Sequence, residues 1–189
     1  MGGSDDVTTG YVVDGYIKNG FVFLDGDEDG IYDEGEQWSY SDENGYFLID
    51  GGSGSLILDN SQDPEGAIAV DMANQQVFTG VMSAPAGSSV VTPLTTIVSA
   101  MMDADDSLTS AGANDAVVAA LGLTAGTDLT SLDPIAAENA EVLKAGLVVA
   151  SMIESAGGGE FGLLLSSELA AAFSAAAEGG TEFDTPSAD

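Results

Sequence analysis

Two hydrophobic patterns divide the chain near Val91. Before that residue, apolar and polar positions alternate in short runs, separated by clusters of Gly, Asn, Asp and Pro. Period-two alternation bounded by turn residues predicts β-strands. The expected strands are Tyr11–Ile17, Phe21–Leu24, Gln37–Ser41, Gly45–Ile49, Ser55–Asp59, Ala67–Met72 and Gln76–Met82. Short strands at this spacing are typical of a small antiparallel β-sandwich, which we expect over residues 8–91.

After Thr92 the apolar positions follow a helical period. Thr92 and Pro93 supply an N-cap and a first-position proline, so they predict a helix to about Met102. Further helices are expected over about 113–121, from Asp133–Pro134 to about 156 as the longest, and over about 163–177. We therefore expect an α+β protein. Its Ala-rich helical bundle, residues 92–178, packs on the sandwich, and an acidic tail or linker follows at 179–189.

The segment from Asp25 to Glu36 carries the clearest chemical signal. It reads Asp-Gly-Asp-Glu-Asp-Gly-Ile-Tyr-Asp-Glu-Gly-Glu. Carboxylates at loop positions 1, 3, 5, 9 and 12, with glycine at position 6, match the ligand order of an EF-hand-type calcium loop. Position 7 offers a backbone carbonyl. The predicted Ca²⁺ ligands are Asp25, Asp27, Asp29, the carbonyl of Ile31, Asp33 and Glu36.

The segments beside this loop are strand-like. They are short and rich in β-branched and aromatic residues, whereas a true EF-hand has an amphipathic helix on each side. After the loop, the turn Asp42–Gly45 between two alternating runs predicts a β-hairpin. A calcium ion held between strands has a structural role, because a sensor needs paired helices that open.

The composition excludes several function classes. The chain has 32 acidic residues, two lysines as its basic residues, no histidine and no cysteine, and a formal net charge of −30. Such a surface repels nucleic acid and anionic membranes. It stays soluble in saline, calcium-rich surroundings, where salt screens the self-repulsion. Without His or Cys there is no ordinary base for a nucleophile and no soft-metal site, so we expect no enzyme.

Several stretches carry a resemblance to a known family. Asp14–Ile17, Phe21–Asp25, the acidic loop and Ser41–Phe47 are similar to prealbumin-like, collagen-adhesin B-type repeats of bacterial surface proteins. Ser83–Ser88, Val90–Thr96 and 121–135 resemble a module that follows such repeats in large calcium-dependent (RTX-type) adhesins. The resemblance implies a secreted, extracellular, calcium-rigidified module without enzymatic activity. The chain lacks the glycine- and aspartate-rich nonapeptide repeats of such adhesins, so export by their route is only an inference.

Other candidate sites have simpler interpretations. Asp42 and Asn44 shape a turn through Asx hydrogen bonds or contribute to a metal site. Asp103, Asp105 and Asp106 bind a second ion or form a solvated helix end, which is the preferred interpretation. Two further sets remain open. Lys18 lies in a Lys-Asn-Gly run that resembles a solvent-facing turn, and the alternative is an isopeptide bond. Trp38, Tyr40 and Tyr46 are cross-strand packing residues, the preferred interpretation, or a sugar platform.

Three functions follow from these patterns. The first is a structural or spacer module of a surface adhesin, in contact with neighbouring modules of its own chain. The second is a self-assembling subunit of an extracellular filament or matrix, in which sheet edges join identical subunits. The third is a calcium-dependent module that binds a glycan or protein. The short start Met1–Ser4 looks like a linker, so we also expect a piece of a larger exported protein.

Overall fold

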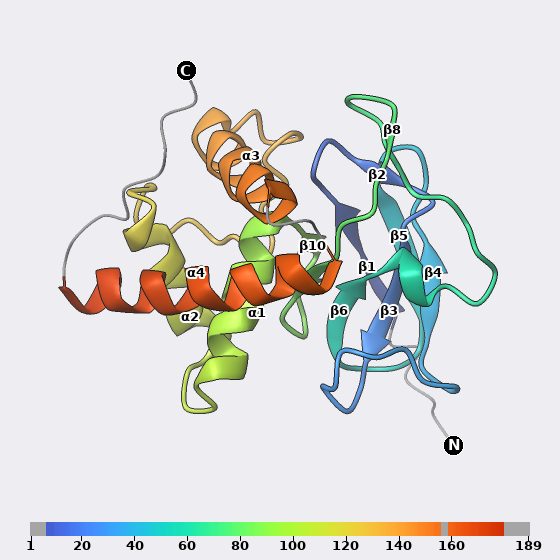
Figure 1. The fold of residues 1–189 in the computed structure, drawn as a ribbon, viewed down its shortest axis with the longest axis horizontal. Coiled ribbons are helices and arrows are strands. Elements are labelled where there is room, and N and C mark those ends of the chain that lie inside the picture. The colour runs from blue at the N-terminus through green and yellow to red at the C-terminus, as the bar shows by residue number, and fades with distance from the viewer. Residues whose placement is uncertain (1–6, 156–158, 180–189) are drawn as a thin grey trace.

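The alternating first half of the chain forms strands at one end of the molecule, and helices occupy the other end (Figure 1). The computed structural model describes residues 7–155 and 159–179. Within them lie the strands β1 (Val7–Val12), β2 (Ile17–Lys18), β3 (Phe21–Asp25), β4 (Trp38–Tyr40), β5 (Tyr46–Asp50), β6 (Ser55–Leu58), β7 (Val70–Asp71), β8 (Gln76–Val77), β9 (Met82–Ala84) and β10 (Val90–Val91), and the 3-10 helix η1 (Asn60–Gln62). The α+β expectation is confirmed.

The ten strands form three sheets, with orders β10-β1-β5, β2-β7-β8 and β4-β3-β6-β9. All pairs of these strands are antiparallel, as expected, except β1 with β10, which is parallel. The predicted hairpin across Asp42–Gly45 is wrong. The turn forms, but β4 pairs with β3 whereas β5 pairs with β1, so the chain passes from one sheet to another at this turn.

The β10-β1-β5 and β4-β3-β6-β9 sheets bury one shared core. In β5, Phe47 and Ile49 are buried while Leu48 and Asp50 are exposed, as period-two alternation requires. Val12, Leu24, Ile49, Leu58 and Met82, from five strands, belong to the same cluster. Two sheets facing one core are consistent with a sandwich, which stays a prediction.

In the part of the chain that the structure describes, four helices follow β10: α1 (Pro93–Ala104), α2 (Ser110–Ala120), α3 (Ala140–Ser155) and α4 (Gly159–Gly179). The predicted start of α1 is confirmed. The Thr92 side chain accepts a hydrogen bond from the Thr95 amide at 3.0 Å, the Thr95 hydroxyl accepts one from the Thr92 amide at 2.8 Å, and Pro93 takes the first position. This reciprocal capping fixes where the helical half begins. The expected end of the long helix at about 156 lies outside the described residues, and so does the expected tail 179–189 apart from Gly179, which ends α4.

Asp133 does not open the third helix, contrary to the sequence expectation. Its carboxylate caps only a short turn, accepting hydrogen bonds from the amides of Ile135 and Ala136. Glu138 then adopts a left-handed backbone with φ 50°, which stops the turn. The Asn139 side chain then caps the start of α3, where it accepts a hydrogen bond from the Val142 amide at 3.1 Å. α3 is therefore shorter than expected, and α4, with 21 residues, is longer than the 16 residues of α3.

α1 lies between the strands and the other helices. Leu94, Ile97 and Met101 belong to the core of the helical half. On the strand side, the Ser83 carbonyl in β9 accepts a hydrogen bond from the Thr95 hydroxyl at 2.8 Å, and the Ser83 amide donates to the Thr96 hydroxyl at 3.0 Å. These buried hydroxyls join the two halves through polar contacts with defined geometry.

We predict that Thr95→Val destabilises both halves together. Valine fills the same space but leaves the Thr92 amide and the Ser83 carbonyl without their Thr95 partner, at a cost of about 1–3 kcal/mol. Urea unfolding at fixed calcium measures the stability of each half: Trp38 fluorescence reports the strand half, and helical circular dichroism reports the helical half. Coincident transitions that shift equally are expected, and the exposed Thr124→Val is the control. Two separate transitions in the wild type would contradict the coupling of the halves.

Candidate metal centre

The acidic loop connects two paired strands. β3 ends at Asp25 and β4 begins at Trp38, with Phe21 opposite Tyr40 and Phe23 opposite Trp38. The loop therefore lies between strands rather than helices, as the sequence predicts. Because both ends of the loop continue into the paired strands β3 and β4, an ion bound in the loop would also stabilise the pairing of these strands.

Asp25 fixes the backbone of the loop. Its side chain is 2% exposed, and its two carboxylate oxygens accept hydrogen bonds from the amides of Glu28 and Gly30, both at 2.8 Å. Left-handed backbone at Glu28 (φ 64°) and Gly30 (φ 77°) turns the chain around this carboxylate. Glycine adopts that conformation without steric cost, which explains its place at position 6.

Asp25, Asp27 and Asp29 converge on one point. A carboxylate oxygen of each lies within 4.8 Å of those of the other two. Asp25 is buried, whereas Asp27 and Asp29 are exposed. Each pair of like charges at this distance costs about 1–3 kcal/mol, depending on the local dielectric. An all-oxygen, trianionic group of this kind suits a hard divalent cation.

The remaining predicted ligands lie outside this group. Glu36 closes the loop, because its two carboxylate oxygens accept hydrogen bonds from the amides of Gly26 at 2.7 Å and Asp33 at 3.1 Å. Asp33 and Ile31 are exposed, and the Ile31 amide donates to Asp29 at 2.8 Å. The structure thus brings three of the six predicted residues together, with Glu36 against the start of the loop.

Gln62 supports the loop, and sequence reasoning missed it. Its side-chain oxygen accepts a hydrogen bond from the Tyr32 amide at 2.7 Å, while its nitrogen donates to the Gly30 carbonyl at 3.0 Å and to Asp59 at 2.9 Å. Gln62 ends η1, about thirty residues along the chain. The polar run Asp59–Gln62 directly after β6 was the available signal in the sequence. The sequence does not show that this run lies beside the acidic loop, because that depends on which strands pair.

Aromatic packing fixes the second half of the loop. The Tyr32 ring contacts Phe21 edge-on at a centroid distance of 5.1 Å and Phe23 at 5.6 Å. Both phenylalanines are fully buried. Because Phe21 also packs against Trp38 at 5.1 Å, the loop, β3 and β4 share one aromatic cluster. Trp38 and Tyr40 therefore have packing roles, and Tyr46 packs elsewhere, against Tyr11.

The helix end at Asp103 faces the loop. Burial, together with the negative charges of Glu28 and Asp25, raises the pKa of the Asp103 carboxyl. Asp105, in contrast, ends α1 and accepts hydrogen bonds from Ser107, as a solvated helix end does.

Asp42 shapes its turn as expected, accepting hydrogen bonds from the amides of Asn44 and Tyr46. Lys18 lies in β2, opposite Val70.

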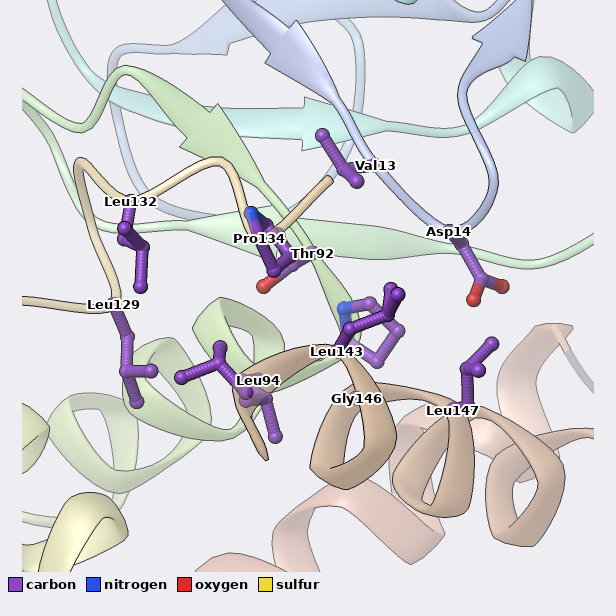
Figure 2. A pocket seen from close by; sticks show the side chains of 12 residues that line it. Val13, Asp14, Thr92, Leu94, Leu129, Leu132, Pro134, Leu143, Gly146 and Leu147 are labelled. Carbon is purple, nitrogen blue, oxygen red and sulfur yellow. The ribbon is translucent and has the colours of Figure 1, made fainter. Parts of the chain in front are cut away.

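A second carboxylate lies at another contact between the halves. Asp14, in the turn after β1, lines a largely apolar pocket whose other wall includes Leu143 and Leu147 of α3 (Figure 2). Burial, then the charges of Asp71 and Glu154, raises the pKa of the Asp14 carboxyl to about 7. In the same turn, burial and the hydrogen bond to Asp133 raise the pKa of Tyr16 to about 12.

Comparisons of this chain with protein-family models, curated proteins and solved structures give no match. None of the helices that the structure describes has the length and apolarity needed to cross a membrane. The candidate site therefore has to be interpreted from its own geometry and chemistry.

We predict that Asp14→Asn flattens the pH dependence of stability between about pH 4 and 7. The unfolded carboxyl releases its proton near pH 4 and the folded one near pH 7, so wild-type stability falls across this window and then levels off. The penalty is up to about 4 kcal/mol. In chelator and constant salt, the variant should be the more stable protein at pH 8 and equal to wild type near pH 4. An unchanged profile, matching that of the exposed control Asp50→Asn, would contradict the assignment.

Proposed function

We propose that the Asp25–Glu36 loop binds a calcium ion that rigidifies the strand end of the molecule. The observation that carries the proposal is the convergence of the Asp25, Asp27 and Asp29 carboxylates, within 4.8 Å, on a loop fixed between two paired strands. Their mutual repulsion opposes the loop conformation that Asp25 holds. A divalent cation removes that repulsion and replaces it with attraction.

Calcium fits the loop better than magnesium. Calcium accepts six to eight oxygens in a flexible geometry, whereas magnesium requires six in a near-ideal octahedron. The loop offers more oxygens than the three that converge, since Asp33, Glu36 and the Ile31 carbonyl follow at the spacing of an EF-hand-type loop. On binding, we expect Glu36 to supply two oxygens, which is the step that completes a seven-oxygen shell.

We infer that the protein is a non-enzymatic, extracellular structural module, used as a spacer in a bacterial surface adhesin. The formal charge of −30 supports this role, because it keeps neighbouring modules apart and soluble in saline. The calcium requirement also favours surroundings richer in free calcium than cytoplasm. The sequence offers no histidine or cysteine for catalysis, which makes a passive role the economical one.

One observation favours the alternative of a self-assembling subunit. Val7, Tyr11 and Leu48 are 46%, 38% and 48% exposed, and the register of β1 and β5 places them on one face of the sheet. An exposed apolar face of this kind is suited to contact with another surface. Light scattering in calcium distinguishes the two roles: a monomer supports the spacer, and calcium-dependent growth supports assembly.

We predict that calcium raises the melting temperature strongly and that Asp27→Asn loses most of this rise. Binding to the folded state at a calcium concentration a thousandfold above Kd adds about 4 kcal/mol, or roughly 8–16 °C for a chain of this size. Magnesium should give a much smaller rise. Differential scanning calorimetry, in chelator and then in calcium, measures the effect. A calcium response in Asp27→Asn equal to that of the control Asp50→Asn would refute the site.

We predict that Gln62→Ala weakens calcium binding about 10- to 100-fold without removing it. Gln62 touches the loop backbone rather than the ion, so its loss loosens the geometry of the ligands. A competition titration against a fluorescent chelator measures the change in Kd. The exposed Gln76→Ala is the matched control, and equal affinities in the two variants would show that the loop needs no support from η1.

A further inference from the structure

The Gln62 side chain holds the two peptide units that meet at Ile31. Its oxygen accepts a hydrogen bond from the Tyr32 amide at 2.7 Å, and its nitrogen donates to the Gly30 carbonyl at 3.0 Å. The Tyr32 N–H and the Ile31 C=O belong to one planar peptide unit, and the Gly30 C=O and the Ile31 N–H belong to the unit before it. One side chain therefore fixes the rotation of both peptide planes.

Both peptide planes carry groups of the proposed calcium site. In a trans peptide unit the N–H and the C=O point in opposite directions, so the bond from Tyr32 directs the Ile31 carbonyl away from Gln62. This carbonyl is the ligand expected at loop position 7. In the preceding unit, the Ile31 amide donates to Asp29, a member of the converging carboxylate group, at 2.8 Å. Gln62 thus acts on two expected ligands through the loop backbone.

Asp59 determines which end of the Gln62 amide faces which partner. Its side chain is 8% exposed, and one carboxylate oxygen accepts a hydrogen bond from the Gln62 nitrogen at 2.9 Å. A carboxylate accepts hydrogen bonds and does not donate them, so it requires the nitrogen on its side and leaves the oxygen for the Tyr32 amide. The reversed amide would place its oxygen against both the Asp59 carboxylate and the Gly30 carbonyl.

Asp59 is itself held in place. Its other carboxylate oxygen accepts hydrogen bonds from the Ser61 amide at 2.9 Å and from the Ser61 hydroxyl at 2.6 Å. The residue caps η1 directly after β6, and β6 pairs with β3, the strand that leads into the loop. Both of its oxygens already have partners, so its place in the structure suits orienting Gln62 better than binding an ion.

We propose that Asp59 is a positioning residue of the calcium site: by fixing the Gln62 amide, it orients the Ile31 carbonyl and Asp29 before the ion binds. This inference rests on the proposed function of the Asp25–Glu36 loop. Ligands that are already in place bind more tightly, because less conformational freedom is lost on binding. Partners that orient metal ligands typically contribute about 10- to 100-fold in affinity.

A double-mutant cycle, measured by competition against a fluorescent calcium chelator, tests this role. Asp59→Asn should weaken calcium binding about tenfold in the wild-type background. In the Gln62→Ala background it should have little further effect, because the side chain that Asp59 orients is absent. Asp71→Asn is the control, since it removes a similarly buried carboxylate from the separate sheet β2-β7-β8.

The outcomes separate the positioning role from the loop site. An equal loss in both backgrounds would overturn the role, since it would show that the Asp59 charge attracts the ion directly. Unchanged affinity in Asp59→Asn would also overturn it and leave the loop site intact. Absence of calcium binding in wild type would overturn the loop site and the positioning role together.

Gln62→Glu distinguishes orientation from charge by the sign of its effect. The side chain is only half-buried and keeps its size, so the variant should fold, which its melting temperature in chelator checks. Direct attraction by the added negative charge would tighten calcium binding. We expect binding about tenfold weaker, because glutamate lacks the donor for the Gly30 carbonyl and repels Asp59. Equal or tighter binding would overturn the proposal.

The carbonyl carbon of Ile31 reports the proposed ligand by nuclear magnetic resonance. Saturating calcium should move its chemical shift in wild type and in Asp71→Asn, and should move it less in Asp59→Asn and Gln62→Glu. The full wild-type shift in both of these variants, or no calcium-induced shift in wild type, would contradict an Ile31 carbonyl oriented by Asp59 and Gln62.

Discussion

The buried carboxylate of Asp25 is the constraint on which the loop and its surroundings depend. Two backbone amides hold it, and in doing so they wrap the chain so that Asp27 and Asp29 return to the same point. The hydrogen bonds satisfy Asp25 but leave the neighbouring charges opposed to one another. The local backbone therefore holds these carboxylates in mutual repulsion, which a bound cation would relieve.

Repulsion between carboxylates also occurs outside the loop. With 32 acidic residues and two lysines, the chain cannot neutralise its carboxylates with its own basic groups. Carboxylates face one another at two contacts between the halves, Asp14 with Asp71 and Glu154, and Glu28 with Asp103. At the first, burial and the charges of Asp71 and Glu154 raise the pKa of Asp14 to about 7, so a proton relieves the repulsion below that pH. We therefore expect the stability of the joined molecule to depend on its ionic surroundings.

Features encoded within a few residues could be predicted from the sequence, whereas features created by topology could not. The capping pair Thr92 and Thr95 is local and is found where expected, and the equally local spacing of the acidic loop brings three of its six predicted ligands together. Sheet membership is not local, so the turn at Asp42 gave no sign that β4 and β5 pair with different strands. Gln62 reaches the loop only because β6 pairs with β3, which brings η1 beside Gly30. At Asp133, a strong cap signal was overridden by the left-handed turn at Glu138.

Calorimetric titration of the chelator-stripped protein tests the central claim most directly. Calcium and magnesium are titrated separately at constant salt and pH, so that screening by added ions stays fixed. The account predicts saturable calcium binding of defined stoichiometry, and magnesium binding that is much weaker. No calcium heat, or equal affinity for the two ions, would contradict the claim that the Asp25–Glu36 loop is a calcium site.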